Sequence, residues 1–332
     1  MAYQSRSILL PDFSSLHLTV LGDLMVDEYL RGIVRRISPE GPVVVVEVQA
    51  EDWQPGGAAN VAANVRAMGA SSDVIGLVGE DEMGARLRES LGRMGVGTDG
   101  LTVEGARPTT RKTRIVAHSQ QVVRVDRETT CAPNEASLLT LVAAVKSSVD
   151  RSSALLVSDY RKGCLTAKLA EEVMAYCRKA GKPVYVNPKP SSASWFRGAA
   201  ALSLNHGEAE ALLGPLEPPG PALKLQGEDL RSQLGVQALL ITLGPVGLAC
   251  WTAEDGYTFV EANTVEVYDV AGAGDTTMAA FALSLAGGSP APVAAMIANH
   301  AGACAVRKTG VAAVTYAELA RAVHAGTTST TE

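Results

Sequence analysis

Short runs of β-branched residues alternate with Ala- and Leu-rich stretches of helical length through most of the chain. This pattern predicts an α/β fold in three layers, with a doubly wound, mostly parallel sheet between helices. The expected strands are 18–23, 73–79, 154–159, 183–188 and 238–244. The expected helices, whose apolar residues recur at helical spacing, are 58–68, 82–94, 136–149, 166–180, 208–213, 274–286 and 291–306. Ligands collect at the carboxyl ends of parallel strands, so we expect the active site there.

Two β-rich segments, 31–50 and 107–127, interrupt the alternation because no helix separates their strands. We interpret them as antiparallel β-ribbons that form a small lid over the site. Such a lid has an apolar face, which closure over a substrate, pairing with a second subunit, or both would bury. We therefore expect a homodimer through the lid. The chain as a whole, 1–332, is expected to be a single domain, with a disordered tail at 326–332.

The stretch VYDVAGAGD, residues 267–275, combines glycines with an acidic residue at a predicted change from strand to helix. We expect a strand to end at residue 267 or 268 and a helix to begin near Asp275. The small-residue loop before Asp275 contains Gly272, Ala273 and Gly274. Its unpaired N–H groups would point at one spot and suit an anion such as phosphate, while Asp275 accepts the proton of an attacking hydroxyl. An ordinary tight turn, with Asp275 as an N-cap, is the alternative.

A second glycine pair lies in PGGAAN, where Gly56 and Gly57 precede a predicted helix. Asn60 and Asn64 follow on one face of this helix, one turn apart. Asn is a poor residue for a helix interior, so its use twice calls for an explanation. Hydrogen bonds to sugar hydroxyls would supply one, and bonds between helices or helix caps would supply another.

Two aspartates follow the first predicted strand, since Asp23 ends it and Asp27 lies four residues later. Carboxylates at a strand's carboxyl end can each accept two hydroxyl hydrogens from a polyol. These side chains favour a sugar ligand. The alternative is that one caps a helix and the other is solvated.

The net charge of -6 and the pI of about 5.5 argue against general binding to nucleic acid or to an anionic membrane. The sequence has no run of about 18 apolar residues and no signal-peptide pattern, which predicts a cytoplasmic protein. It also lacks the GxxxxGK[ST] motif and the HRD and DFG motifs, which disfavours the other common phosphoryl-transfer folds.

PGGAAN near the start and DVAGAGD near the end resemble the two glycine motifs of the ribokinase-like carbohydrate kinases, also called the PfkB family. The resemblance covers roughly residues 18–323 and implies the ribokinase-like fold and ATP-dependent phosphorylation of a sugar hydroxyl. RISPEGPVVVVEV, SQQVVRVDRE and SDYRKGCLT resemble, more narrowly, the heptose 7-phosphate kinases of lipopolysaccharide-precursor synthesis. Those enzymes phosphorylate the anomeric 1-hydroxyl to give a 1,7-bisphosphate. The nucleotidyltransferase domain that some of them carry is not expected here.

The resemblance implies a role for each matching residue. It makes Asp275 the catalytic base and assigns the anion hole to Gly272, Ala273 and Gly274. It assigns the sugar to Asp23, Asp27, Gly56, Gly57 and Asn60. It assigns the nucleotide to Lys189, Asn205, Glu208, Thr242, Gly244, Gly247 and Asn299. Mg²⁺ is expected to arrive with ATP and to be organised indirectly by Glu208, and activation by a monovalent cation is left open.

The segment 107–127 is rich in Arg and Lys although the chain is acidic. We expect Arg114 to bind a phosphate that the substrate already carries, because Arg forms bidentate charge-assisted bonds to phosphate. Solvated lid edges are the alternative. The heptose kinases tend to have an Arg where this chain has His118, so a related sugar stays open.

Other functions compete with this interpretation. One is a ribokinase- or fructokinase-like kinase of an unphosphorylated sugar, and another is a catalytically silent sugar-binding protein of the same fold. A Rossmann dehydrogenase is disfavoured, because Gly272 and Gly274 lack a third glycine at the expected spacing and lie far from the first predicted strand.

Overall fold

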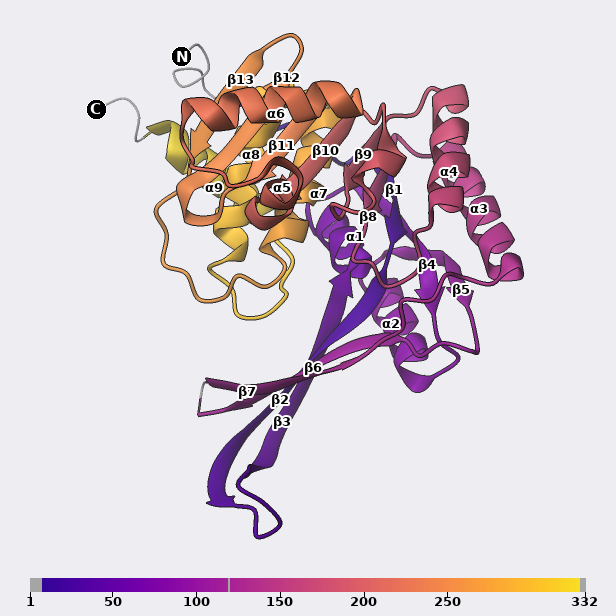
Figure 1. Ribbon diagram of the computed structural model, residues 1–332, viewed down its shortest axis with the longest axis vertical. Coiled ribbons are helices and arrows are strands. Elements are labelled where there is room, and N and C mark those ends of the chain that lie inside the picture. The colour runs from indigo at the N-terminus through magenta and orange to yellow at the C-terminus, as the bar shows by residue number, and fades with distance from the viewer. Residues whose placement is uncertain (1–7, 119, 329–332) are drawn as a thin grey trace.

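A large twisted sheet and a smaller sheet that forms a long arm make up the β-structure of the protein (Figure 1). The computed structural model describes residues 8–118 and 120–328. Within these residues, one sheet has nine strands in the order β13-β12-β11-β10-β9-β8-β1-β4-β5. The strands are β1 His17–Gly22, β4 Ser71–Val78, β5 Gly97–Val103, β8 Ala154–Ser158, β9 Val184–Asn187, β10 Ala201–Asn205, β11 Ala238–Thr242, β12 Gly247–Thr252 and β13 Gly256–Glu261. All neighbours pair in parallel except β12, which is antiparallel to β11 and to β13.

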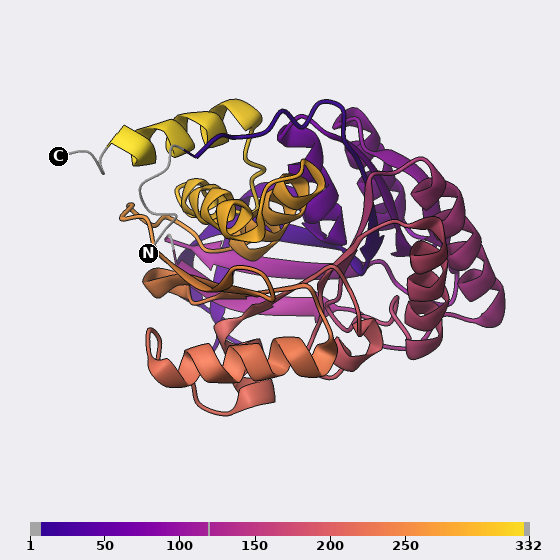
Figure 2. The same cartoon turned by 90° about the horizontal axis from the view of Figure 1, so that it is seen from above.

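Helices cover both faces of this sheet, as the view along its edge shows (Figure 2). One face carries α1 Ala58–Ala67, α2 Glu82–Arg93, α7 Ala273–Ala286, α8 Ala291–Ala305 and α9 Tyr316–Thr328. The other face carries α3 Glu135–Asp150, α4 Ala167–Ala180, α5 His206–Leu213 and α6 Pro221–Leu234. The predicted three-layer α/β architecture is confirmed.

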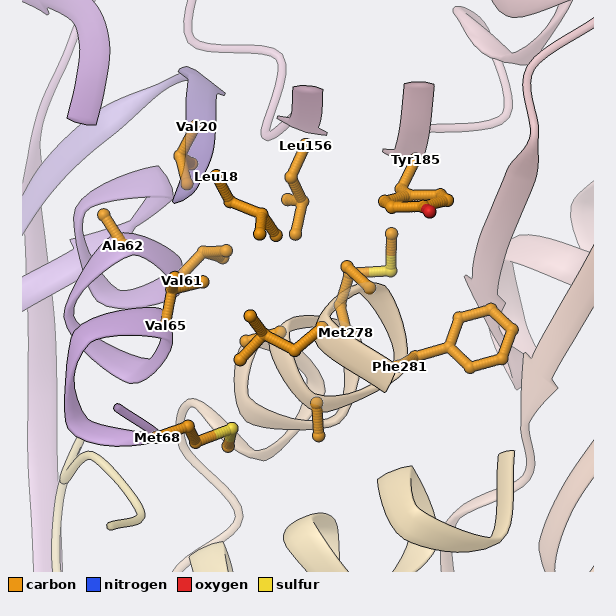
Figure 3. Packing of buried hydrophobic residues seen from close by; sticks show 14 of the residues in the cluster. Leu18, Val20, Val61, Ala62, Val65, Met68, Leu156, Tyr185, Met278 and Phe281 are labelled. Carbon is orange, nitrogen blue, oxygen red and sulfur yellow. The ribbon is translucent and has the colours of Figure 1, made fainter. Parts of the chain in front are cut away.

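Alternating side chains of the central strands supply two separate cores. Leu18 and Val20 of β1 point toward α1 and α7, where Met278 fills the space beneath them (Figure 3). Leu21 of the same strand belongs to the core on the opposite face, with Leu155 of β8. Successive residues of a strand point to opposite faces, so a strand buried on both faces must be apolar throughout. This is why the strands could be located from short apolar runs.

All expected strands of the large sheet and all expected helices are present, each within two residues of its expected ends. The expected strand at 267–268 is wrong, because β13 ends at Glu261 and the chain runs as a loop from 262 to 272. The N–H groups of Tyr268 and Asp269 both donate to the carbonyl oxygen of Val306, at the end of α8. The loop is therefore tied to a helix end and pairs with no strand. The sequence analysis did not include β5, β10, β12, β13, α6 or α9.

The second sheet is the arm, in the order β3-β2-β6-β7 (Figure 1). Its strands are β2 Leu24–Ile37, β3 Val44–Gly57, β6 Thr110–Ala117 and β7 Gln120–Arg127. The two hairpins are antiparallel and join through a parallel pairing of β2 with β6. The expected ribbons are thus present, and the first is longer than 31–50. Because β2 begins two residues after β1 and β3 runs directly into α1, the arm is anchored at the carboxyl edge of the large sheet.

Two further observations concern the extent of the last helix and the length of the helices. The expected tail 326–332 overlaps α9, which extends to Thr328, and residues 329–332 lie outside the described part of the chain. No helix within the described residues is long and apolar enough to cross a membrane.

Two helical glycines allow a test of the packing on the α6 side. A Cβ at Gly227 in α6 would lie 2.3 Å from the ring of the buried Trp251, whereas a Cβ at Gly92 in α2 would meet nothing within 4 Å. We expect Gly227→Ala to lower the free energy of unfolding by about 1–3 kcal/mol through overpacking. Gly92→Ala should raise it by about 0.5–1 kcal/mol through helix propensity. Urea unfolding measures the free energy of unfolding of both variants. Equal changes in the two would show that the steric contact with Trp251 does not decide the effect of Gly227→Ala.

Candidate active site

The carboxyl ends of the parallel strands form one continuous edge. Gly22 of β1 is in register with Ser158 of β8, which is in register with Asn187 of β9. Farther along the edge, Asn205 of β10 pairs with Thr242 of β11. The residues just beyond these positions therefore converge on one side of the sheet, although they come from distant parts of the sequence.

Asp275 lies in the first turn of α7, close to this edge, and only 6% of it is exposed. One carboxylate oxygen accepts a hydrogen bond from the Tyr160 hydroxyl at 2.6 Å, and the other accepts one from Asn60 Nδ2 at 2.8 Å. Burial raises the pKa of Asp275 to about 6, against the lowering effect of these two hydrogen bonds. The structure brings the predicted base together with Asn60, as expected, and with Tyr160, which was not expected.

The loop before Asp275 provides unpaired donors. Gly272 caps α7 in the left-handed conformation at φ 74°, where a Cβ would lie 2.9 Å from Asn60 Nδ2. The N–H of Ala273 donates to the carbonyl of Val270 at 3.3 Å. Within the described residues, the N–H groups of Gly274 and Asp275 have no acceptor. These two amides, at the positive end of a helix dipole, can bind an anion beside the carboxylate.

Asn64 has a structural role that explains its place in the helix. Its Nδ2 donates to the carbonyl and side-chain oxygens of Asn60, and its Oδ1 accepts from the Thr276 hydroxyl and the Val314 N–H. These bonds tie α1 to α7 and to the segment before α9. Of the two explanations for the paired asparagines, bonds between helices account for Asn64, and the bond from Asn60 on α1 to Asp275 on α7 is also of this kind. A sugar contact of Asn60 stays a prediction.

Asp23 is buried at the end of β1 and organises the loop after β8. Its carboxylate accepts three backbone N–H groups, from Tyr160, Lys162 and Cys164. Burial raises the pKa of Asp23, and these three bonds lower it less than burial raises it. The backbone bonds occupy three of about four acceptor positions, so a sugar-binding role of Asp23 stays a prediction.

Asp27 and Arg114, which were both predicted to contact the substrate, contact each other. Asp27 on β2 accepts a hydrogen bond from the guanidinium of Arg114 on β6. That guanidinium also lies 5.3 Å above the ring of Tyr29. A Cβ at Gly56 would lie 2.1 Å from Asp27 Oδ2, so glycine is needed there for the carboxylate to approach β3. Gly57 follows at φ 57° and caps α1 next to the carbonyl of Asp23.

Tyr160 is the site residue that the sequence analysis missed. Its ring lies 5.7 Å from Lys112 Nζ of β6 and 4.9 Å from Lys189 Nζ of the loop after β9. Lys112 has no carboxylate within ion-pair distance among the residues that the structure describes. One observation in the sequence could have drawn attention to Tyr160, since it lies just past the carboxyl end of a predicted strand.

The predicted nucleotide residues form two groups along the edge. In the first, Asn205 and Glu208 make a capping box at the start of α5, each side chain bonding the other's backbone N–H. Lys189 forms an ion pair with Glu208, and this pair connects the group to Tyr160. Lys189 and Glu208 are therefore brought together near the base. An Asn and a Glu three residues apart would also arise from a capping box alone.

The second group lies farther along the same edge. Thr242 ends β11, Gly244 begins a short 3-10 turn, and Gly247 begins β12 opposite Glu261 of β13. Asn299 on α8 donates to the carbonyl of Glu261 at 2.8 Å. These four predicted residues thus surround the β11–β13 end of the sheet, and no hydrogen bond within the described residues links them directly to Asp275.

Two further observations on the described residues concern other kinds of site. A cavity of about 800 Å³ lies at the opposite, amino edge of the sheet, near Pro183 and Ala238, where the β strands begin. Within residues 8–118 and 120–328, no group of three or more His, Cys, Asp or Glu side chains is placed to hold a metal ion.

Comparison with known proteins places the fold and the family. The chain resembles phosphofructokinase-2 from Escherichia coli in complex with substrates and products, with a TM-score of 0.79, 19% identity, and coverage of 93% of this chain and 99% of that chain. It also resembles Arabidopsis thaliana ribokinase complexed with ribose and ATP, with a TM-score of 0.74, 21% identity, and coverage of 92% and 98%. Both comparisons show the ribokinase-like fold.

Curated relatives are more similar in sequence. The chain is 40% identical over 307 residues to the bifunctional protein HldE of Desulfatibacillum aliphaticivorans, covering 92% of this chain and 63% of that relative. It is 41% identical over 316 residues to the bifunctional protein HldE of Citrifermentans bemidjiense, covering 94% and 64%. The chain thus spans slightly less than two thirds of the length of these relatives. The profile of the pfkB family carbohydrate kinases matches residues 16–317, so the chain belongs to the pfkB family of carbohydrate kinases.

Proposed function

We propose that the chain is an ATP-dependent kinase that transfers the γ-phosphate to the anomeric 1-hydroxyl of a heptose 7-phosphate, giving the 1,7-bisphosphate. The observation that carries the kinase reaction is the buried Asp275 carboxylate beside two unpaired amides at the start of α7. Membership of the pfkB family supports the sugar acceptor. The relatives named bifunctional protein HldE fit the sequence resemblance to heptose 7-phosphate kinases.

In the proposed reaction, each group has one step. The sugar hydroxyl donates its proton to the Asp275 carboxylate as its oxygen bonds the γ-phosphorus, and the bond from that phosphorus to the ADP oxygen breaks. The N–H groups of Gly274 and Asp275 stabilise the charge on the transferring phosphoryl group. The α7 dipole acts in the same direction. Because the base is buried, its charge is poorly screened by water, and it accepts a proton more readily than an exposed aspartate.

The nucleotide has a matching set of residues along the edge. Lys189 carries a compact positive charge next to the site, and its ion pair with Glu208 holds it there. Carboxylate oxygens such as those of Glu208 suit Mg²⁺, which binds largely through water and phosphate oxygens. When bound with ATP, Mg²⁺ neutralises phosphate charge. Thr242, Gly244, Gly247 and Asn299 would line the rest of the nucleotide at the β11–β13 end of the sheet.

The lid supplies the cations for a substrate phosphate. Lys112 and Arg114 lie on the same face of β6 as Asp27 and Tyr29 of the neighbouring strand. Arg114 keeps donors that Asp27 does not use, since a guanidinium carries five N–H groups. Half-burial lowers the pKa of Lys112, because it disfavours the charged form. A bound anion would stabilise that charged form. A phosphorylated sugar is therefore a better match to this face than a free sugar.

Turnover of a sugar panel tests the proposal. ADP release with Mg-ATP would be measured with free sugars and sugar phosphates, among them D-glycero-D-manno-heptose 7-phosphate, and products would be identified by mass and phosphorus NMR. We expect turnover with the heptose 7-phosphate. Turnover with free sugars alone would support the ribokinase- or fructokinase-like alternative, and no turnover with any sugar would favour a silent binding protein.

Arg114→Ala should raise the KM for the phosphorylated sugar by about tenfold or more and leave the KM for ATP unchanged, because only the sugar phosphate meets the lid. The matched control is Arg86→Ala, which removes an exposed cation paired with Glu82 on α2. Equal changes in both Michaelis constants would point to a folding defect and against a phosphate contact.

The ionisation of Asp275 makes the reaction pH-dependent. The raised pKa of about 6 means that the carboxylate is charged above that pH and protonated below it. We expect kcat/KM to fall about tenfold per pH unit below pH 6, since a protonated base cannot accept the hydroxyl proton. Asp275→Asn should lower kcat by about 10²- to 10⁴-fold with ATP binding retained in calorimetry. Turnover at the wild-type rate in this variant would remove Asp275 from the mechanism.

We further propose that the lid pairs with the lid of a second copy. Val123 and Val125 of β7 are 45% and 54% exposed, and they lie on the face opposite Lys112 and Arg114. β7 is also an edge strand with an unpaired side, which suits association with another strand. A homodimer through this face would bury both valines and leave the substrate face free.

Val123→Glu with Val125→Glu should shift the chain from dimer to monomer, because charges would be buried at the interface. Sedimentation equilibrium measures the mass. Leu139→Glu on α3, at an exposed leucine far from the lid, is the control and should stay dimeric. A wild-type monomer at high concentration would contradict the proposal.

A further inference from the structure

Tyr160 connects three parts of the site that lie on different elements. Its hydroxyl contacts Asp275 at the start of α7, and its ring lies near Lys112 of the lid and Lys189 of the nucleotide edge. A ring within about 6 Å of an ammonium group attracts it through the negative face of the ring. A single side chain thus contacts the predicted base, a lysine of the arm and a lysine of the nucleotide edge.

The loop that carries Tyr160 is held in one conformation by several independent bonds. Asp23 accepts the N–H groups of Tyr160, Lys162 and Cys164. The next residue, Arg161, has a φ of 56°, which is uncommon for a residue other than glycine. Its N–H donates to Asp159, and its guanidinium lies 5.0 Å from the Trp195 ring. The buried Asp23 therefore fixes the backbone from which Tyr160 points at Asp275.

We propose that Tyr160 is a positioning residue, which orients the Asp275 carboxylate and keeps it in the charged, proton-accepting form. This inference deepens the proposed function and rests on Asp275 as its base. It also gives Asp23 a role, since the loop on which Tyr160 sits depends on its carboxylate. Tyr160 itself transfers no proton.

Charge and burial explain why a phenol suits this position. Burial raises the pKa of Tyr160 well above its ordinary value, and the nearby charge of Asp275 adds to this effect. The phenol therefore stays protonated and always acts as a donor. A hydrogen bond to a carboxylate favours the charged form and so lowers its pKa, against the burial that raises the pKa of Asp275.

The other groups that face Asp275 would remain in a Tyr160 variant. Asn60 of α1 donates to the second oxygen, Asp27 of β2 raises the pKa of Asp275, and Lys189 of the loop after β9 lowers it. Lys112 of β6 and Glu208 of α5 lie around Tyr160. Removing only the hydroxyl thus isolates one contribution.

The two donors leave room for the substrate. A carboxylate oxygen has two acceptor positions, so each oxygen of Asp275 can accept one hydrogen besides those of Tyr160 and Asn60. Because both donors come from well-anchored elements, they leave one acceptor position on each oxygen for the attacking hydroxyl. The attacking hydroxyl can therefore bind without displacing Tyr160.

Tyr160→Phe removes the hydroxyl and keeps the ring between the two lysines. The titration of the Asp275 carboxyl carbon would be followed by carbon-13 NMR in the unliganded protein and assigned by its loss in Asp275→Asn. We expect the midpoint to rise by about one pH unit in Tyr160→Phe, since a hydrogen bond to a charged group is lost. Tyr176→Phe is the matched control, because this partly buried tyrosine of α4 donates to Asp150 of α3, on the face of the sheet away from α7, and it should leave the midpoint unchanged.

The acid limb of kcat/KM should move in Tyr160→Phe by the same amount as the NMR midpoint, with kcat reduced about tenfold. A thermal melting temperature equal to that of wild type would show that folding is intact. Tyr160→Leu, which also loses the ring, is a second variant, and we expect the same shift of the Asp275 midpoint. An unchanged Asp275 midpoint in both variants would overturn the proposal. Since the NMR titration needs no substrate, it separates this outcome from failure of the wild-type protein to phosphorylate any sugar, which would overturn the proposed function instead.

Discussion

The desolvation of one carboxylate is the constraint on which the rest of the site depends. Asp275 is almost fully buried, and an isolated charge in such a place is costly unless donors surround it. Asn60 and Tyr160 supply side-chain donors, and the start of α7 supplies a favourable dipole. The balance leaves a carboxylate that is charged near neutral pH and is still a stronger base than an exposed one.

The donors come from elements that only the fold brings together. Asn60 lies on α1, whose position is fixed by Asn64 through its bonds to Thr276 and Val314. Tyr160 lies on the loop after β8, which Asp23 of β1 holds by three backbone bonds. The two aspartates at 23 and 275 thus have complementary roles, one in holding the loop and one in the proposed chemistry.

The arm, formed by β2, β3, β6 and β7, extends this network beyond the large sheet. β2 begins two residues after β1, so Asp27, with its partner Arg114 on β6, is held close to the carboxyl edge by the same backbone that positions Asp23. Lys112 reaches from the lid to the ring of Tyr160, and Lys189 reaches the same ring from the nucleotide side. A movement of the arm would therefore reach Tyr160, which contacts the proposed base.

The sequence by itself determined the three-layer architecture, because strands buried on both faces must be apolar runs and helices must carry apolar residues at helical spacing. It also located Gly272 and Asp275, since a glycine loop before a helix has a local physical meaning. It did not locate the end of β13, because the segment around Tyr268 is held by Val306, a bond across the fold. Likewise Tyr160, and the bond between Asp27 and Arg114, depend on contacts between residues 87 or more positions apart. Local patterns carry propensity and periodicity, whereas the choice of partner for a polar side chain is made only when the tertiary structure excludes water from it.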